Sequence, residues 1–397
     1  MRRPSFGRLM PLIFALCMLL GVTTVSKYVP VIKTMYYVAL VGYTVMWLGQ
    51  LITRGAVYGN KRGMIFAIIC FISVLVNEIY PFFRPWQRLI SFICLLFMTG
   101  NLFYNAKMKR FIGSVVLDVK VILIIIAVIS LPVELFGLTT FKIYFRGFAG
   151  ITNQSMMLAP ISAMAVLFLL EDILSQPEDT SRRHKWLMWI LFVMSGASLA
   201  LAASRGALGA FIVALVAYIL IRYWGKTKLV RYTILFSVLL ALTVITNPGG
   251  VMDNFNEKME QKELAEDVTS GRDVMWQDRI DDFKMSPVIG VGLNSAVNIK
   301  NSKVDTKRGI IESGSSWLLI LSSTGILGLL AFVNVTFSAV IGNIWRKRNS
   351  VLVAIAIFFL VHSTVEGYVT AAGSPLAFLF WLTIGALNMN KKEEDVD

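Results

Sequence analysis

The sequence predicts an all-α, polytopic membrane protein with about twelve transmembrane helices and one long extracytoplasmic loop that carries short helices. Two observations predict this class. Of the 397 residues, 56% are hydrophobic and only 16% are charged, whereas soluble domains carry about 25% charged residues. Many apolar runs also reach the roughly 20 residues that a helix needs to cross a bilayer. The alternating short segments typical of an outer-membrane barrel are not found in the sequence.

The expected spans follow the apolar runs in chain order. They cover about residues 9–27, 32–52, 63–80, 86–104, 112–132, 151–170, 186–203, 206–223, 230–247, 314–342, 351–368 and 373–389. The basic start precedes the first run without a small-residue cleavage site, so we expect a retained helix. Residues 1–247 then hold spans one to nine, 248–312 the extracytoplasmic loop, and 313–397 the last three spans with a short cytoplasmic tail.

The chain has a net charge of +14, and its basic residues are distributed as membrane topology predicts. With a cytoplasmic N-terminus, 21 basic residues fall in the inner segments and seven in the short outer ones. Because cytoplasmic loops are enriched in lysine and arginine, both termini are predicted to be cytoplasmic. Basic residues clustered between apolar runs argue against a nucleic-acid partner, and the expected partner is the lipid bilayer.

The segment 248–312 departs from this pattern of short loops, because it holds 12 of the 24 acidic residues and nine basic ones. Loops of this length are usually functional or disordered. Helical spacing of apolar residues around Trp276, and the turn "SPVIGVG", favour order. The three cysteines lie in apolar runs, and no phosphate loop, dinucleotide fingerprint or metal-ligand cluster is found in the sequence. We therefore expect no metal and no cofactor.

Four unusual groups map to the outer face. Arg205, preceded by Ser204, lies in "AASRGALGA", whose small residues suit a ligand cavity; lipid headgroups are the alternative neighbours of this arginine. Arg146 and Asn153 lie in "YFRGFAGITNQSMMLAP", where Asn153 could instead cap a helix.

The other two groups lie further along the chain. "SGRDVMWQDRIDDFKMSPVIGVG" holds Arg272, Trp276 and Arg279, which could equally be solvated loop residues. His362 and Glu366 stand four residues apart, on one face of the predicted outer helix end, as functional groups or a structural pair.

These motifs resemble the O-antigen ligase/polymerase family from about residue 140 to 368. "RGFAGITNQSMMLAP" is similar to its R-x-x-G-x-x-x-N segment, and "ASRGALGAFIVAL" to its S-R-G hairpin. The loop stretch "SGRDVMWQDRIDDFKMSPVIGVGLNS" resembles the G-R-x-x-x-W to P-l-x-G-x-G signature, and "SSWLLILSSTGILGLLAF" the following helix. Ligases of this family carry a His-Asn pair where this chain has Gly314 and Ser315, which favours the polymerase branch.

The resemblance implies a GT-C-like, metal-independent glycosyltransferase in the bacterial cytoplasmic (inner) membrane, with its active site on the periplasmic or outer face. Its donor and acceptor would be undecaprenyl-pyrophosphate-linked oligosaccharides, and a chain-length regulator and a flippase are candidate partners. The candidate catalytic residues are Arg205 and Arg272 for the pyrophosphate, and Glu366, Glu312 or His362 for the acceptor hydroxyl. The candidate substrate-binding residues are Arg146, Asn153, Ser204, Trp276 and Arg279.

Two alternatives stay open. A ligase would transfer the glycan to a lipid A core or a protein. A transporter or flippase for lipid-linked oligosaccharides also fits twelve spans, although such proteins place ionisable residues near the membrane midplane. The main midplane exceptions here are Asp118 and Lys120, which we interpret as a structural pair near the inner end of their span.

Overall fold

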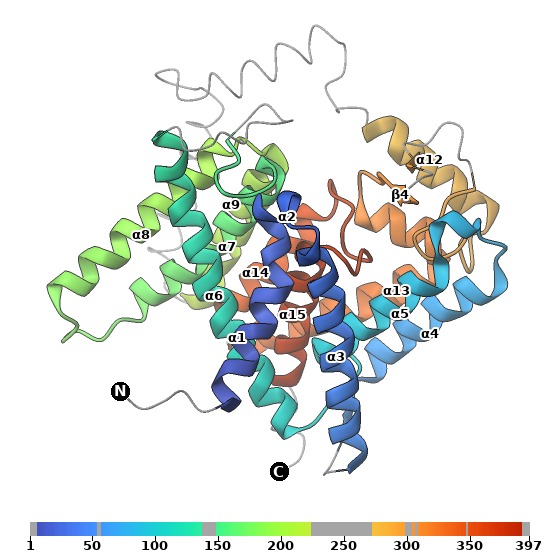
Figure 1. The fold of residues 1–397 in the computed structure, drawn as a ribbon, viewed down its shortest axis with the longest axis horizontal. Coiled ribbons are helices and arrows are strands. Elements are labelled where there is room, and N and C mark those ends of the chain that lie inside the picture. Colours follow the sequence, from blue (N-terminus) through green and yellow to red (C-terminus); the bar gives the residue numbers. More distant parts are fainter. Residues whose placement is uncertain are drawn as a thin grey trace, which may run out of the picture. The chain divides into compact units, whose positions relative to one another are not determined.

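A computed structural model describes residues 6–53, 57–136, 148–223, 272–297, 304–305, 309–346 and 348–390, and it is predominantly helical (Figure 1). Six helices in these ranges are long and apolar enough to cross a membrane: α3 (Val31–Thr53), α6 (Ala106–Leu135), α7 (Ser155–Leu174), α8 (Arg182–Leu201), α9 (Arg205–Arg222) and α13 (Ser316–Trp345). Shorter apolar helices accompany them. The chain is thus a helical, polytopic membrane protein, whereas the count of twelve spans and the GT-C-like arrangement stay predictions. The expected span 230–247 lies outside the described residues.

The chain forms two compact units, each assembled from three stretches of sequence. Unit 1 comprises Met1–Lys33, Val115–Glu266 and Arg346–His362. Unit 2 comprises Thr34–Ser114, Asp267–Trp345 and Ser363–Asp397. The boundaries expected at residues 247 and 312 separate transmembrane spans from the extracytoplasmic loop and not compact units. They stay a prediction.

Unit 1 is built on apolar helix packing. It contains α1 (Phe6–Leu19), η1 (Leu20–Val22), α2 (Val25–Tyr28), most of α6, and the helices α7, α8, α9 and α14 (Ser350–His362). Helix α7 packs against α8, α9 and α14, and α9 packs extensively against α14. Small buried side chains such as Ala207, Ala210 and Ala214 on α9 permit this close approach.

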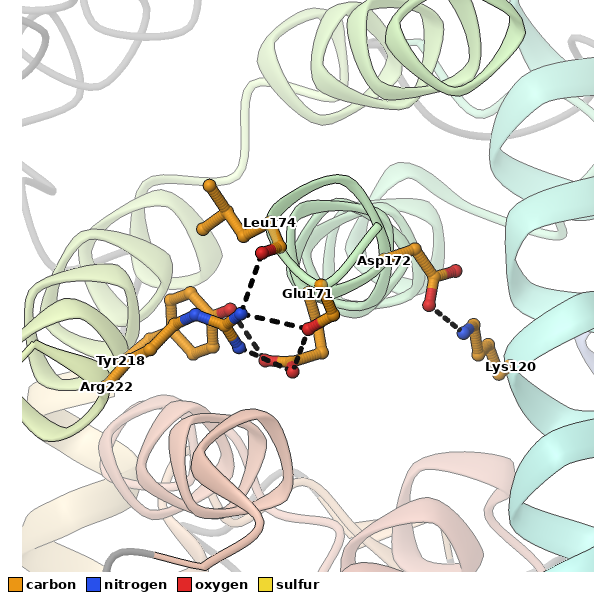
Figure 2. A network of polar contacts seen from close by, with 7 residues as sticks. Lys120, Glu171, Asp172, Leu174, Tyr218 and Arg222 are labelled. Atoms are coloured by element: carbon orange, nitrogen blue, oxygen red, sulfur yellow. Dashed lines mark hydrogen bonds and ion pairs between the residues drawn. The ribbon is translucent and has the colours of Figure 1, made fainter. Parts of the chain in front are cut away.

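Charged side chains join three of these helices (Figure 2). Glu171 on α7 accepts hydrogen bonds from the Tyr218 hydroxyl and the Arg222 guanidinium of α9, each at 2.6 Å. Its neighbour Asp172 pairs with Lys120 of α6 at 2.5 Å. The expected pairing of Lys120 with Asp118 is therefore wrong. Positions two apart on a helix do not face each other, and Asp172 supplies the counter-charge from a neighbouring helix.

Unit 2 surrounds an aromatic core. Its helices are α3, α4 (Lys61–Val76), η2 (Pro81–Phe83), α5 (Pro85–Met98), α12 (Arg272–Met285), α13 and α15 (Pro375–Asn390). Two short antiparallel pairs, β1 (Tyr58–Gly59) with β2 (Phe103–Tyr104) and β3 (Val304–Asp305) with β4 (Ile310–Ile311), complete it. The rings of Phe66, Phe92, Phe332 and Trp381 contact one another at its centre.

Helix α13 is broken at Gly325, and the turn that follows α12 inserts into the break. The backbone of Gly325 leaves helical geometry at φ 66° and ψ −169°. The amides of Val291 and Gly292 donate to the carbonyls of Ser322 and Ser323 at 2.9 and 3.0 Å, and the Ile326 amide donates to Pro287 at 2.9 Å. The turn predicted at "SPVIGVG" thus satisfies backbone groups that the break releases, which is required inside a membrane protein.

Two glycines make this insertion possible. A Cβ on Gly325 would lie 2.2 Å from the Val288 carbonyl oxygen, and one on Gly290 would lie 2.3 Å from the Ser323 carbonyl carbon. Both residues also have a positive φ, of 66° and 78°, which side chains disfavour. We call the contact between residues 287–292 and the break at Gly325 the loop–helix staple.

Replacing Gly325 with alanine tests the staple. The substitution combines backbone strain of about 1–3 kcal/mol with displacement of the 287–292 turn, so we expect a lower melting temperature in detergent. The matched control is Gly113→Ala on α6, where a Cβ meets no atom within 4 Å and alanine favours the helix by up to about 1 kcal/mol. Equal melting temperatures for the two variants would contradict this account of the staple.

Candidate functional site

The structure brings three of the candidate residues together in unit 2. Arg272 begins α12, and its guanidinium pairs with the Glu366 carboxylate at 2.5 Å, although the residues lie 94 positions apart. Glu312, just before α13, is near enough for its charge to act on Glu366. Both members of the ion pair stay reachable, because their side chains are 26% and 23% exposed. We call Arg272, Glu312 and Glu366 the acidic–arginine cluster.

The start of α13 fixes the backbone that carries Glu366. Ser316 donates its backbone amide at 3.0 Å and its hydroxyl at 2.7 Å to the Glu366 carbonyl. The same amide also donates to the Ser363 carbonyl at 2.9 Å. These contacts satisfy a helix N-terminus whose amides have no partner within the helix. Sequence reasoning missed Ser316, whose signal is a serine at the start of an apolar helix.

The expected helical pairing of His362 with Glu366 is wrong. Helix α14 ends at His362, and Glu366 lies in the loop before α15. The carbonyls of Ser363 and Glu366 bind Ser316 instead of continuing the helix. The His362 side chain is buried and stacks on Phe358, with ring centroids 5.4 Å apart.

The electrostatic environment sets the ionisation of Glu366. Burial is the largest influence and raises the pKa of its carboxyl, the Arg272 charge lowers it, and the Glu312 charge raises it again, to about 7. A carboxyl with a pKa near 7 exists in both forms at neutral pH, which suits a group that accepts and releases a proton.

Trp276 and Gly314 join α12 to the segment before α13. The Trp276 indole N–H donates to the Gly314 carbonyl at 3.1 Å. Gly314 has a φ of 64°, and a Cβ there would lie 3.2 Å from the indole nitrogen. The position where ligases of the resembled family carry histidine is thus shaped for glycine in this chain.

Arg279 lies deeper than the other loop residues and is only 1% exposed. It pairs with Asp282 at 3.0 Å and donates to the Ser295 carbonyl at 3.3 Å. The Asp282 carboxylate also accepts from the Val297 amide at 3.2 Å. These contacts connect α12 to residues 295–297, so Arg279 supports the backbone around the staple.

The remaining described candidates belong to unit 1. Arg205 is the exposed first residue of α9, after Ser204, whose side chain forms no cap hydrogen bond. The Asn153 amide group donates to the Gly21 carbonyl at 2.9 Å and the Ser26 hydroxyl at 3.0 Å. Gln154, and not Asn153, occupies the cap position of α7. Arg146 lies outside the described residues.

The acidic–arginine cluster predicts opposite pKa changes in two variants. Arg272→Gln removes the positive charge that lowers the pKa of Glu366, so that pKa should rise. Glu312→Gln removes a repelling negative charge, so the pKa of Glu366 should fall. Infrared titration of the protonated carboxyl band, with Glu366→Gln to assign the band, measures both. Shifts in the same direction would contradict the proposed cause.

Comparison with known proteins covers this part of the chain. A family model described as O-Antigen ligase matches residues 189–333, a range that includes Arg205, Arg272, Trp276 and Glu312. Glu366 lies beyond the matched range. No curated protein matches the chain. Members of the matched family are glycosyltransferase-like enzymes. The match confirms, over residues 189–333, the resemblance to the O-antigen ligase/polymerase family that the motifs indicate.

Proposed function

We propose that the protein is a polysaccharide polymerase of the bacterial inner membrane. It transfers a growing O-antigen, capsule or exopolysaccharide chain from undecaprenyl pyrophosphate to the non-reducing sugar of another lipid-linked repeat unit. The observation that carries the proposal is the acidic–arginine cluster, in which a carboxyl with a pKa near 7 touches an arginine of the family-matched segment. This pairing supplies a base and a binding group for a phosphate-linked donor.

The proposed reaction is a single inverting displacement. Glu366 accepts the proton of the acceptor hydroxyl, whose oxygen attacks the anomeric carbon of the donor sugar. The bond from that carbon to the pyrophosphate oxygen breaks, and its electron pair leaves with the pyrophosphate. Arg272 and Arg205, with Arg146, neutralise the charge that develops there, and no metal takes part. Glu312 is the alternative base, because its residue is exposed and its charge acts on Glu366.

The proposed substrate contacts involve the other motif residues. Asn153, Ser204 and Trp276 bind the lipid-linked oligosaccharide, and Trp276 offers its aromatic face to a sugar. Arg279 acts by holding the backbone at residues 295–297, since its guanidinium is buried against Asp282. A chain-length regulator and a flippase remain the proposed protein partners.

The geometry at residue 314 favours a polymerase over a ligase. A histidine at this position would have to adopt a φ of 64° and place its Cβ 3.2 Å from the Trp276 indole nitrogen. Non-glycine residues rarely accept such strain. The backbone at residue 314 therefore does not suit the ligase histidine. In our proposal the Glu366 carboxyl takes the place of that histidine.

Substitutions in cells test the assignment. Arg272→Ala, Arg205→Ala, Arg205→Lys and Glu366→Gln should each shorten the polymer to single attached repeat units at matched protein levels. Loss of one such group costs a factor of about 10²–10³ in rate. The control is Arg110→Ala, an exposed arginine of α6. Normal polymer ladders in the arginine variants would refute the proposal, and accumulation of long unattached polymer would indicate a ligase.

The pH dependence tests the role of Glu366. Because a base must be ionised, kcat/KM for glycan elongation by the purified protein should rise with pH through about 7, the pKa of Glu366. Glu312→Gln should move this rise to lower pH. A rise that does not move in Glu312→Gln would exclude Glu366 as the base. Elongation in detergent without an ion gradient would exclude a transporter.

A further inference from the structure

Unit 2 contains a cavity of about 410 Å³ that the motif residues do not explain. Ligand pockets commonly measure about 300–1,000 Å³, so this cavity can hold a small ligand or one sugar of a longer one. Its polar lining comes from α3, from α5 and the residue before it, from the loop after α12 and from the loop after Glu366, and it includes Tyr37, Arg84, Gln87, Arg88, Asn294 and Thr370.

One wall of the cavity is a polar face of α5. Arg84, Gln87, Arg88 and Ser91 recur at helical spacing from the residue before the helix to its second turn, so their side chains lie on the same side. Arg84 occupies the cap position and its side chain makes no cap hydrogen bond. The positive end of the helix dipole adds to the two arginine charges on this wall.

The two arginines give the cavity a net positive character. Arg88 donates to the Asn294 carbonyl at 3.0 Å and to the Gly309 carbonyl, both of which are neutral acceptors. Arg84 is close enough for its charge to repel that of Arg88. Among the residues that the structure describes, no carboxylate forms an ion pair with either arginine. Buried or partly buried cations normally have such a partner, so the lining suits an oxyanion.

A second part of the lining connects the cavity to the acidic–arginine cluster. Gly367, the residue after Glu366, lines the cavity together with residues 370–374. The Thr370 hydroxyl donates to the Asn294 side chain at 2.6 Å, which holds this wall against the loop that follows α12. A ligand in the cavity therefore lies next to the backbone that carries the proposed base.

We propose that this cavity binds an oxyanion of the glycan substrate through Arg84 and Arg88. Gln87, Ser91 and Ser374 contact hydroxyl groups of the same substrate. This inference rests on the proposed function for the identity of the ligand. Carboxylate and phosphate share the geometry that the arginine fork recognises. The oxyanion belongs either to an acidic sugar of the acceptor or to the phosphate of its lipid carrier, and the test separates these two sources.

Arg84→Asn is the decisive variant. Arg84 has a φ of 50°, a conformation in which asparagine is favoured several-fold over most residues, so the substitution removes the charge without adding strain. Arg88 is less suitable, because its bonds to the Asn294 and Gly309 carbonyls support the fold. The matched control is Arg110→Asn, an exposed arginine of unit 2 that does not line the cavity.

Binding is measured by calorimetry on the full-length protein in detergent with three probes: methyl glucuronoside, geranyl pyrophosphate and neutral methyl glucoside. At least one anionic probe should bind saturably, and Arg84→Asn should weaken it about tenfold or more, as expected for a charge-assisted hydrogen bond. Arg110→Asn should bind like the wild type. Binding of the glucuronoside assigns the oxyanion to the sugar, and binding of the pyrophosphate assigns it to the carrier.

Three results would overturn the inference: no saturable binding of either anion, equal binding by Arg84→Asn and Arg110→Asn, or equal affinity for the neutral glucoside. Binding is read without catalysis. A protein that shows this binding pattern and yet forms no polymer would refute the proposed polymerase and leave the oxyanion site standing. Normal polymerisation with no anion binding would refute the oxyanion site and leave the proposed polymerase standing.

Discussion

The loop–helix staple is the contact on which the rest of unit 2 depends. A transmembrane helix that breaks at Gly325 leaves amides and carbonyls without partners, and hydrocarbon offers none. Residues 287–292 supply those partners from the chain that directly follows α12. These contacts hold the chain that directly follows α12, and α12 in turn carries Arg272 and Trp276, which contact Glu366 and Gly314. A local backbone requirement thus positions charged groups that are distant in sequence.

The ion pair at the centre of the cluster has a second physical meaning. A salt bridge between partly exposed side chains contributes little stability, and it can open at small cost. In the proposed reaction, Arg272 exchanges the Glu366 carboxylate for the pyrophosphate of the donor, and Glu366 loses the cation that favours its ionised form. Donor binding is therefore expected to make the carboxylate more basic when the acceptor hydroxyl needs a base. In this proposal, the ion pair couples the roles of Arg272 and Glu366 in the reaction.

Much of this arrangement could be predicted from sequence. Apolar runs predicted the positions of the helices, and the motif around Arg272 and Trp276 indicated an ordered loop, because these signals are local. The partner of Lys120 and the end of α14 at His362 could not be predicted, because they depend on Asp172 and Ser316 in other segments. The cavity beside α5 was hidden for a related reason. In the sequence, Arg84 and Arg88 look like ordinary basic residues beside an apolar run. Only in the folded structure do they line a cavity together with residues of the 367–374 loop.

The order of synthesis gives the separation of Arg272 and Glu366 a further consequence. A ribosome delivers the N-terminal parts of a chain first. Residues 287–292 therefore reach the membrane before α13, and the staple can close as soon as that helix is inserted. Glu366 arrives 94 positions after Arg272, when α13 and α14 are already in place. The Arg272–Glu366 pair therefore cannot form until α13 and α14 have been synthesised, and the aromatic core of unit 2 is completed later still, when Trp381 of α15 arrives.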